Sequence, residues 1–326
     1  MTSKQKTKSM KKKSVIAGDD DDKFIVTNSR SSVIFGLCDA NNESSMNLSS
    51  TETKLYKRRW WILFVFSWTS FANSVVYASY ASISTQSVVY YNVDFNWINS
   101  LSSMFYLAYI PFSFISGWFI DKYGISKAVI LGSIFQTLGA WIKYFSSFSY
   151  DPVGDFAGVF VGQLISAISQ TFIVGCTGLL PVYWFGPKER VTATSIGFMM
   201  NTFGTGAALL IAPYVVASDG TGMPVWLLSN AVFVTVVTIM ALIWMKNKPP
   251  IPPSPYAVSQ DETSVTHITF KKALKMLFTN RNYVLIWLSE GFMLGIFWAF
   301  QALIQQIGYN SGYGDSAGIY GFIVKK

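Results

Sequence analysis

Two apolar segments of the chain are joined by the stretch Gly117-Trp118-Phe119-Ile120-Asp121-Lys122-Tyr123-Gly124. Gly124 suits a tight turn, because glycine adopts backbone conformations that other residues avoid. Gly117 suits a close approach of neighbouring helices, because it has no side chain to hold them apart. Asp121 stands at the edge of an apolar segment, where a carboxylate can cap a helix or form an ion pair. An ordinary tight loop, in which Asp121 and Lys122 are charges that end a membrane span, is the simpler interpretation.

The composition of the chain is that of a membrane protein. Of its 326 residues, 51% are hydrophobic and 13% are charged, whereas soluble proteins average roughly 25% charged residues. Aromatic residues make up 17%, which suits a chain with many membrane–water interfaces. The net charge of +8 arises mostly from an N-terminal tail and from short gaps between apolar segments. Because it does not gather on one folded face, we do not expect nucleic-acid binding.

Seven apolar segments are long enough to cross a bilayer, for which a helix needs about 20 residues. They cover residues 60–87, 98–120, 127–147, 156–182, 191–216, 224–245 and 283–308. A further apolar stretch, 316–324, is too short and looks like the start of an eighth helix. The pattern predicts an all-α integral membrane protein.

The segments divide into two unequal groups. Six of them precede a polar linker, 246–282, which begins Pro249-Pro250-Ile251-Pro252-Pro253 and is expected to be extended there. We therefore predict a six-helix bundle over 54–245 and an incomplete second half over 283–326, as in a transporter built from two repeats. Residues 1–53 are too polar to form a core and are predicted to be a disordered cytosolic tail. Such a chain is expected to be a truncated form of a longer transporter.

Basic and acidic residues alternate from loop to loop. With the N-terminus in the cytosol, the cytosolic loops contain Lys122, Lys127, Lys188, Arg190, Lys246, Lys248, Lys271, Lys272, Lys275 and Arg281, and the opposite loops contain Asp94, Asp151, Asp155, Asp219 and Asp315. Lys143, at the end of the third segment, is the one basic residue expected near the opposite face. Because cytosolic loops carry the excess of Lys and Arg, we predict a cytosolic N-terminus. We expect the plasma membrane rather than an internal one.

The stretch 117–124 resembles the signature G-x-x-x-D-[RK]-x-G of the major facilitator superfamily, and it lies in the matching loop. A second stretch follows the fourth segment and reads Trp184-Phe185-Gly186-Pro187-Lys188-Glu189-Arg190. The resemblance implies a major facilitator fold. In that fold Gly117, Asp121, Lys122, Gly124, Glu189 and Arg190 would belong to gating motifs.

Further stretches narrow the resemblance. They are Lys57-Arg58-Arg59-Trp60, Leu138-Gly139-Ala140-Trp141-Ile142-Lys143, Trp184 to Glu189 and Pro252-Pro253-Ser254. With Gln163 and Gln170, they are similar to the feline leukaemia virus subgroup C receptor-related transporters, solute carrier family 49. The similarity covers roughly residues 54–324.

This resemblance implies a cargo and a site. Members of the family carry choline or related small solutes, and haem has also been proposed for some. Those that carry choline hold it between aromatic residues of helices one and seven, assisted by a glutamine of helix four. The matching positions are Tyr77, Trp298 and Gln170, with Gln163 as the alternative glutamine. Aromatic faces attract a quaternary ammonium by ~0.5–2 kcal/mol each, although both rings could also merely pack.

Charges inside the segments bear on the choice of cargo. No Lys or Arg is expected deep within a segment, so the sequence does not favour an anionic substrate. Glu290 lies within the seventh segment, where an acid could attract a cation or carry a coupling proton; alternatively, it reaches headgroup water near the inner end. A proton-linked transporter of a neutral, vitamin-like solute is therefore an alternative. Haem has little support, because an axial ligand is usually His, Cys, Met or Tyr and the single histidine, His267, falls in a polar loop.

Two other classes of protein fit the sequence less well. A seven-helix receptor would keep its N-terminus outside, against the loop charges. An enzyme would need a cluster of catalytic side chains that the motifs do not indicate, so we predict no catalytic residues, no metal site and no cofactor. Cys38 and Cys176 do not suggest a disulfide framework. The predicted partners are a small-molecule substrate and the lipid bilayer, and the oligomeric state stays open.

Overall fold

The computed structural model describes residues 54–147, 152–253 and 270–308. The predicted tail, 1–53, and the predicted start of an eighth helix, 316–324, lie outside these ranges. Within them the secondary structure is helical and contains no strand.

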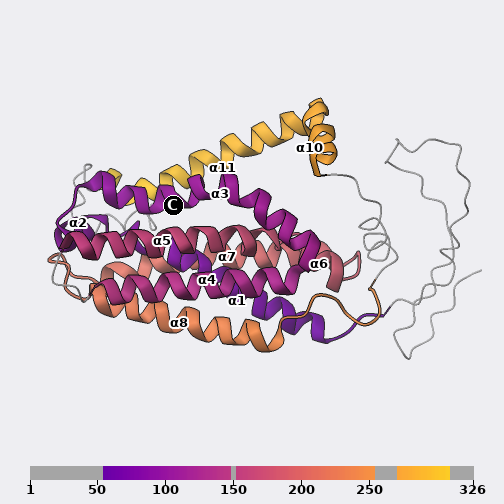
Figure 1. Ribbon diagram of the computed structural model, residues 1–326, viewed down its shortest axis with the longest axis horizontal. Coiled ribbons are helices and arrows are strands. Elements are labelled where there is room, and N and C mark those ends of the chain that lie inside the picture. The colour runs from indigo at the N-terminus through magenta and orange to yellow at the C-terminus, as the bar shows by residue number, and fades with distance from the viewer. Residues whose placement is uncertain (1–53, 148–151, 254–269, 309–326) are drawn as a thin grey trace, which may run out of the picture. The chain divides into compact units, whose positions relative to one another are not determined.

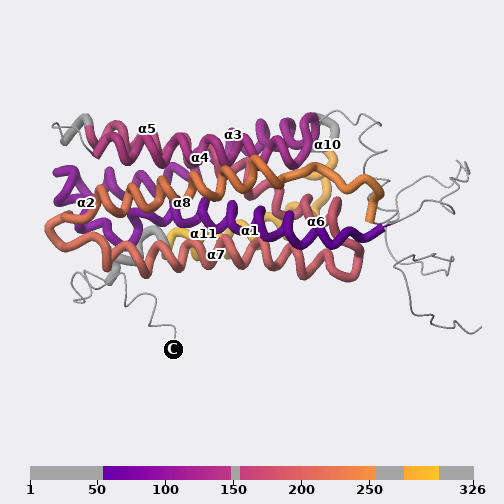
Figure 2. Tube along the Cα trace, turned by 90° about the horizontal axis from the view of Figure 1, so that it is seen from below, coloured from indigo at the N-terminus to yellow at the C-terminus, as the bar shows by residue number. Residues whose placement is uncertain are grey.

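Most of the long described helices run along one axis, whereas the short helix that begins at Phe270 lies across it (Figures 1 and 2). In chain order the helices are α1 (Arg58–Tyr77), the 3-10 turn η2 (Ala78–Tyr80), α2 (Ser84–Tyr91), α3 (Phe95–Tyr123), α4 (Ile125–Ser146), α5 (Pro152–Gly175), α6 (Leu179–Trp184), α7 (Arg190–Val215), α8 (Met223–Trp244), α10 (Phe270–Thr279) and α11 (Arg281–Gly308). Seven spans in the described ranges are long and apolar enough to cross a membrane. This confirms the predicted all-α membrane fold.

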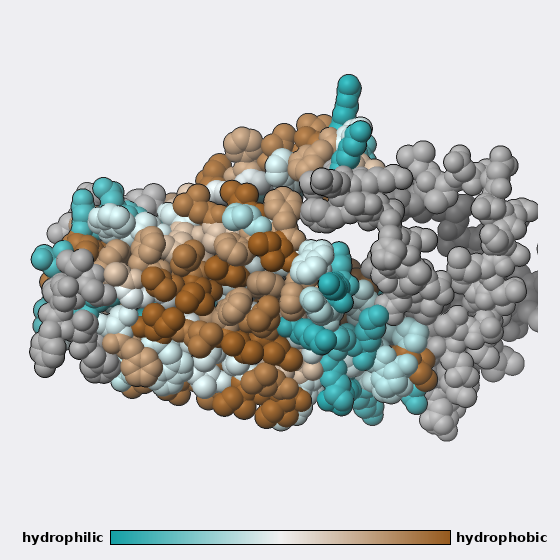
Figure 3. Space-filling view, in the orientation of Figure 1, coloured by the Kyte–Doolittle hydropathy of each residue, from teal (hydrophilic) through white to brown (hydrophobic). Residues whose placement is uncertain are grey.

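Large apolar side chains cover the outside of the bundle along the middle of its helices (Figure 3). Leu107 of α3 is 70% exposed and Tyr214 of α7 is 73% exposed. A soluble monomer rarely leaves so large an apolar surface open. Lipid tails are as apolar as these side chains, so the surface is suited to face a bilayer.

The helix ends gather charges of opposite sign. One end, here called the basic end, carries Arg58, Lys122, Lys127 and Lys188, and the other, the acidic end, carries Asp94, Asp155 and Asp219. At the basic end Arg59 forms an ion pair of 3.0 Å with Glu189, which joins the start of α1 to the start of α7. At the acidic end Asp219 accepts hydrogen bonds from the backbone and hydroxyl of Thr221. These bonds lower the pKa of the Asp219 carboxyl.

Two apolar segments are each divided between two helices. The first segment, 60–87, contains α1 with η2 and then the separate helix α2. Near the break, the Ser79 hydroxyl donates to the carbonyls of Val75 and Val76, at 2.9 and 2.7 Å, and such bonds compete with the helical ladder. The fourth segment, 156–182, turns between α5 and α6. The predicted linker begins without a helix at its prolines, as expected, but contains α10.

Glycines bring helices together at two places in the bundle. A Cβ on Gly162 of α5 would lie 2.6 Å from the carbonyl oxygen of Gly139 in α4. Gly204 of α7 likewise faces the backbone of Phe71 in α1. A Cβ on Gly117 would meet nothing within 4 Å in the described residues, so the close approach expected there stays a prediction. Gly124 adopts the predicted turn, with a φ of 86°.

The position of Lys143 differs from the prediction. Its side chain is 1% exposed, inside the bundle rather than at a face. The aliphatic stem lies against Gly162, and the ammonium donates to Oε1 of Gln163 at 2.8 Å and lies 5.9 Å from the ring centre of Tyr80. A long apolar stem lets lysine bury most of its length, but a buried ammonium needs an acceptor. No carboxylate of the described residues pairs with it, so Gln163 supplies the main polar contact.

Loss of that acceptor should destabilise the bundle. We expect Gln163→Leu to cost about 1.5–3 kcal/mol, the usual range for a hydrogen bond to a charged group. Thermal unfolding in detergent micelles would measure the change. Gln170→Leu in the same helix is the matched control, because Oε1 of Gln170 makes no hydrogen bond to the described residues.

A second variant separates the charge from the loss of packing. Lys143→Met combined with Gln163→Leu should recover most of the stability, since apolar residues often replace a buried polar pair without loss. Equal melting temperatures for Gln163→Leu and the parent protein would contradict this account.

Candidate functional site

Aromatic rings from three helices meet near the acidic end. Tyr77, at the end of α1, is 5% exposed. Its ring centroid lies 5.2 Å from Phe105 and 6.0 Å from Tyr106, both in α3. The ring of Trp298, in α11, lies 5.6 Å away at an angle of 86°. We call these four residues the aromatic cluster, and it contains both aromatic residues implied by the family resemblance.

Hydrogen bonds tie the aromatic cluster together. The hydroxyls of Tyr77 and Tyr106 are bonded to each other, and the Tyr106 hydroxyl also lies 3.3 Å from the backbone carbonyl of Trp298. Tyr106 therefore links α1 to α11. It was not among the predicted site residues. The sequence did offer a signal for Tyr106, because it is a tyrosine inside an apolar segment. The hydroxyl of a buried tyrosine must find a hydrogen-bond partner.

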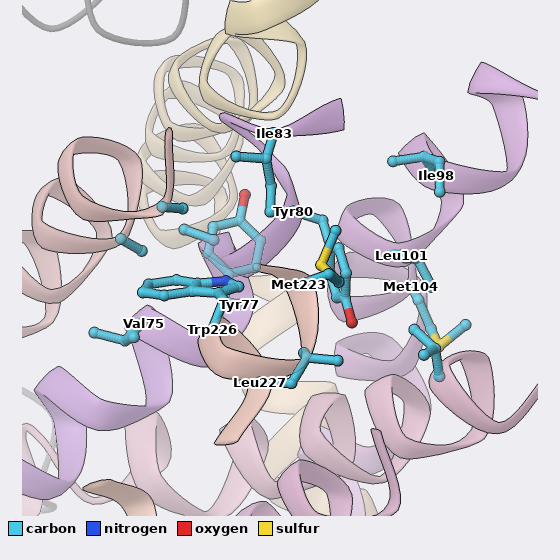
Figure 4. Close-up of a cluster of buried hydrophobic side chains, with 14 of the residues drawn as sticks. Val75, Tyr77, Tyr80, Ile83, Ile98, Leu101, Met104, Met223, Trp226 and Leu227 are labelled. Carbon is cyan, nitrogen blue, oxygen red and sulfur yellow. The ribbon is translucent and has the colours of Figure 1, made fainter. Parts of the chain in front are cut away.

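A core of buried side chains supports Tyr77 (Figure 4). Tyr80 and Trp226 lie beside it, from η2 and α8. The indole nitrogen of Trp226 donates to the carbonyl of Ser79 at 3.1 Å, which fixes the end of α1. The position of Tyr77 is thus held by packing from several helices.

The two candidate glutamines have different surroundings. Gln163 is fully buried and accepts the Lys143 hydrogen bond, so it has a structural partner. Gln170 has a buried carbonyl oxygen without a hydrogen-bond partner in the described ranges. Ala167, one turn before Gln170, packs in the same core as Tyr77. Gln170 is thus the candidate glutamine whose side-chain oxygen has no hydrogen-bond partner among the described residues.

The rings of the aromatic cluster are packed against each other. An edge-to-face pair at 5.6 Å leaves no room for an ammonium group between the rings. A cation lies up to about 6 Å from a ring centroid, so two rings that face it from opposite sides would stand about 10 Å apart. The described arrangement would have to open to admit a ligand between Tyr77 and Trp298.

The charged motif residues lie at the basic end. Lys122 places its ammonium 5.0 Å from the ring centre of Trp118 and 5.4 Å from that of Tyr123. Asp121 makes no ion pair with the described residues. Glu189 pairs with Arg59, and Arg190 begins α7.

Glu290 lies away from these groups. It is the tenth residue of the span Arg281–Phe300, and its side chain is exposed in the described part of the chain. Counted along the helix, it lies about 14 Å from Arg281. That depth is close to the middle of a span. The described residues contain no cluster of three His, Cys, Asp or Glu that could hold a metal ion.

Comparisons with known proteins agree with this architecture. The model of the Major Facilitator Superfamily matches residues 57–324. The choline/ethanolamine transporter FLVCR1 of Mus musculus is 30% identical over 274 residues, which cover 78% of this chain and 48% of the relative. Solute carrier family 49 member A3 of Xenopus tropicalis is 29% identical over 285 residues, covering 84% of this chain and 57% of the relative. The predicted resemblance is confirmed.

A solved structure supports the fold independently. The D-xylose-proton symporter superposes with a TM-score of 0.54 at 12% identity, covering 81% of this chain and 66% of that one. The chain spans about half the length of the curated relatives it matches. From the family match over most of its length and its seven apolar spans, we conclude that this multi-pass membrane protein belongs to the major facilitator superfamily.

Proposed function

We propose that this chain takes part in carrying a small organic cation, choline or a similar ammonium compound, across a membrane. The contact between Tyr77 and Trp298 is the observation that carries the proposal. It brings together rings from α1 and α11, which the linker separates in sequence. The relatives named as choline/ethanolamine transporters support the same class of cargo.

The chemistry of the aromatic cluster suits such a cargo. A quaternary ammonium cannot donate a conventional hydrogen bond, and ring faces attract it by ~0.5–2 kcal/mol each. Trp298 and Tyr77 would supply these faces. The hydroxyl of choline, or the ammonium of ethanolamine, needs an acceptor, and the unused oxygen of Gln170 is one.

Transport requires that the rings separate and close again. Figure 1 shows α11 meeting α3 near α2 and diverging from it toward α10. We infer that the six-helix half, which contains α1 and α3, and the second half, which contains α11, rock against each other in an alternating-access cycle.

Glu290 favours a second candidate function. An acid near the middle of a span is costly in lipid and marks a proton or ion path by default. A proton-linked carrier of a neutral solute would use Glu290 as the proton site and the aromatic cluster for packing.

We also propose that the basic end faces the cytosol, as the excess of Lys and Arg there indicates. A tag at the N-terminus should then be reached by antibody only after cells are permeabilised. The sequons at Asn42 and Asn47 should stay unmodified, so that glycosidase treatment leaves the mass unchanged. Tag staining on intact cells would contradict this orientation.

The cation site predicts how ring variants change uptake. Tyr77→Leu and Trp298→Leu should each lower the uptake of radiolabelled choline at sub-saturating concentration by about 2- to 30-fold, which corresponds to the loss of one ring face. Phe292→Leu is the matched control, because Phe292 is also in α11 and is 73% exposed. Normal uptake in both ring variants, at equal surface abundance, would reject the cation site.

Glu290→Gln distinguishes the two candidate functions. For a proton-linked carrier, the variant should abolish the dependence of uptake on external pH. For a cation carrier without a coupled proton, parent and variant should both carry choline equally well at pH 6 and pH 7.5.

A further inference from the structure

A hollow of about 170 Å³ lies between α3 and α5, toward the basic end. We call it the α3–α5 hollow. Its polar lining consists of Tyr109, Ser113, Ser116, Asp121 and Thr171. At about 30 Å³ per water molecule, its volume corresponds to five or six waters, the size of a small organic ion.

The α3–α5 hollow continues the face of α3 that carries Tyr106. Tyr106, Tyr109, Ser113 and Ser116 follow one another at intervals of three or four residues, so they share one face of the helix. From Tyr106 to Asp121 the helix rises about 22 Å. A row of hydroxyl groups therefore leads from the aromatic cluster to a carboxylate at the basic end.

Three hydroxyl groups of the lining use their protons on backbone carbonyls and therefore present acceptors to the hollow. Ser113 donates its proton to the carbonyl of Ile110 at 3.0 Å, and Ser116 donates to that of Ser113 at 3.0 Å. Thr171, across the hollow in α5, donates to the carbonyl of Ile168 at 2.8 Å. Each hydroxyl oxygen keeps lone pairs after its proton is used. The lone pairs of these three hydroxyl groups favour a cation over an anion.

Asp121 adds a negative charge at the mouth of the α3–α5 hollow. The carboxylate is exposed and makes no ion pair with its neighbour Lys122, whose ammonium faces aromatic rings instead. A Cβ on Gly117 would meet nothing within 4 Å in the described residues, so there is open space beside the helix backbone.

We propose that the α3–α5 hollow is a second subsite for a small organic cation, between the aromatic cluster and the basic end. Lone pairs of the hydroxyl groups and the carboxylate of Asp121 hold the cation there. The identity of the cargo rests on the proposed function, but the preference for positive charge follows from the lining alone.

Thiol labelling tests the charge preference. The variant Ser113→Cys is made in a background of Cys38→Ser and Cys176→Ala. Open membranes that contain it are treated with one of two methanethiosulfonate reagents. One reagent carries a trimethylammonium group and the other carries a sulfonate. After correction for their rates with a free thiol, the cationic reagent should react at least about fivefold faster. Asp121→Asn should remove most of that preference.

Two matched positions serve as controls. Ile115→Cys lies in α3 at similar depth but outside the lining, and should react slowly with both reagents. Ser195→Cys lines a different hollow, beside Arg190, and should react without a cation preference. Three outcomes would each overturn the proposal. The two reagents could react with Ser113→Cys at equal corrected rates, or Asp121→Asn could leave the preference for the cationic reagent unchanged. Ser113→Cys could also fail to react while Ser195→Cys reacts.

Protection by ligand separates the subsite from the choline assignment. Millimolar choline or tetramethylammonium should slow labelling of Ser113→Cys by the cationic reagent, whereas acetate should not. One combination of results supports the subsite and rejects choline as cargo. In it, the preference for the cationic reagent depends on Asp121, and tetramethylammonium protects Ser113→Cys whereas choline does not. Protection by acetate alone would overturn the subsite.

Discussion

A bilayer offers no water to a polar side chain, and this constraint governs how the described helices pack. Many hydroxyl groups inside the spans donate to the backbone of their own helix, as Thr69 does to Val65 at 2.9 Å and Ser133 to Val129 at 2.8 Å. An ammonium cannot be satisfied in this way. Lys143 therefore needs Gln163 on the neighbouring helix, and the two can meet only because Gly162 allows α4 and α5 to approach.

The same constraint shapes the surfaces available to a cargo. Since serine and threonine protons are used by backbone carbonyls, the hydroxyl groups that line the interior offer mainly lone pairs. Tyr106 is an exception, because its longer side chain reaches past its own helix to Tyr77 and to the carbonyl of Trp298. A chain that uses hydroxyl groups to pack helices thus acquires an interior that favours positive charge.

The sequence predicted the membrane spans well. Whether a segment can cross a bilayer depends on the length of its apolar stretch and little on contacts with other helices. It predicted neither the break near Ser79 nor the burial of Lys143, since both depend on contacts between helices. For the aromatic cluster, the family resemblance supplied Tyr77 and Trp298, whereas Tyr106 emerged only from the packing of α3. Of the two glutamines, the resemblance favoured Gln170, and the hydrogen bond that Lys143 donates to Gln163 could not be read from any spacing along the chain.

The buried charge of Lys143 has a consequence for the proposed cation site. Its ammonium faces Tyr80, one turn beyond Tyr77. When Lys143 is charged, its ammonium and a cation held by Tyr77 would repel each other. This repulsion opposes the attraction of the ring faces and would weaken the binding of a cation at the aromatic cluster. Weak binding suits a carrier, which must release its cargo, and on the proposed path the attraction of Asp121 would favour release toward the basic end.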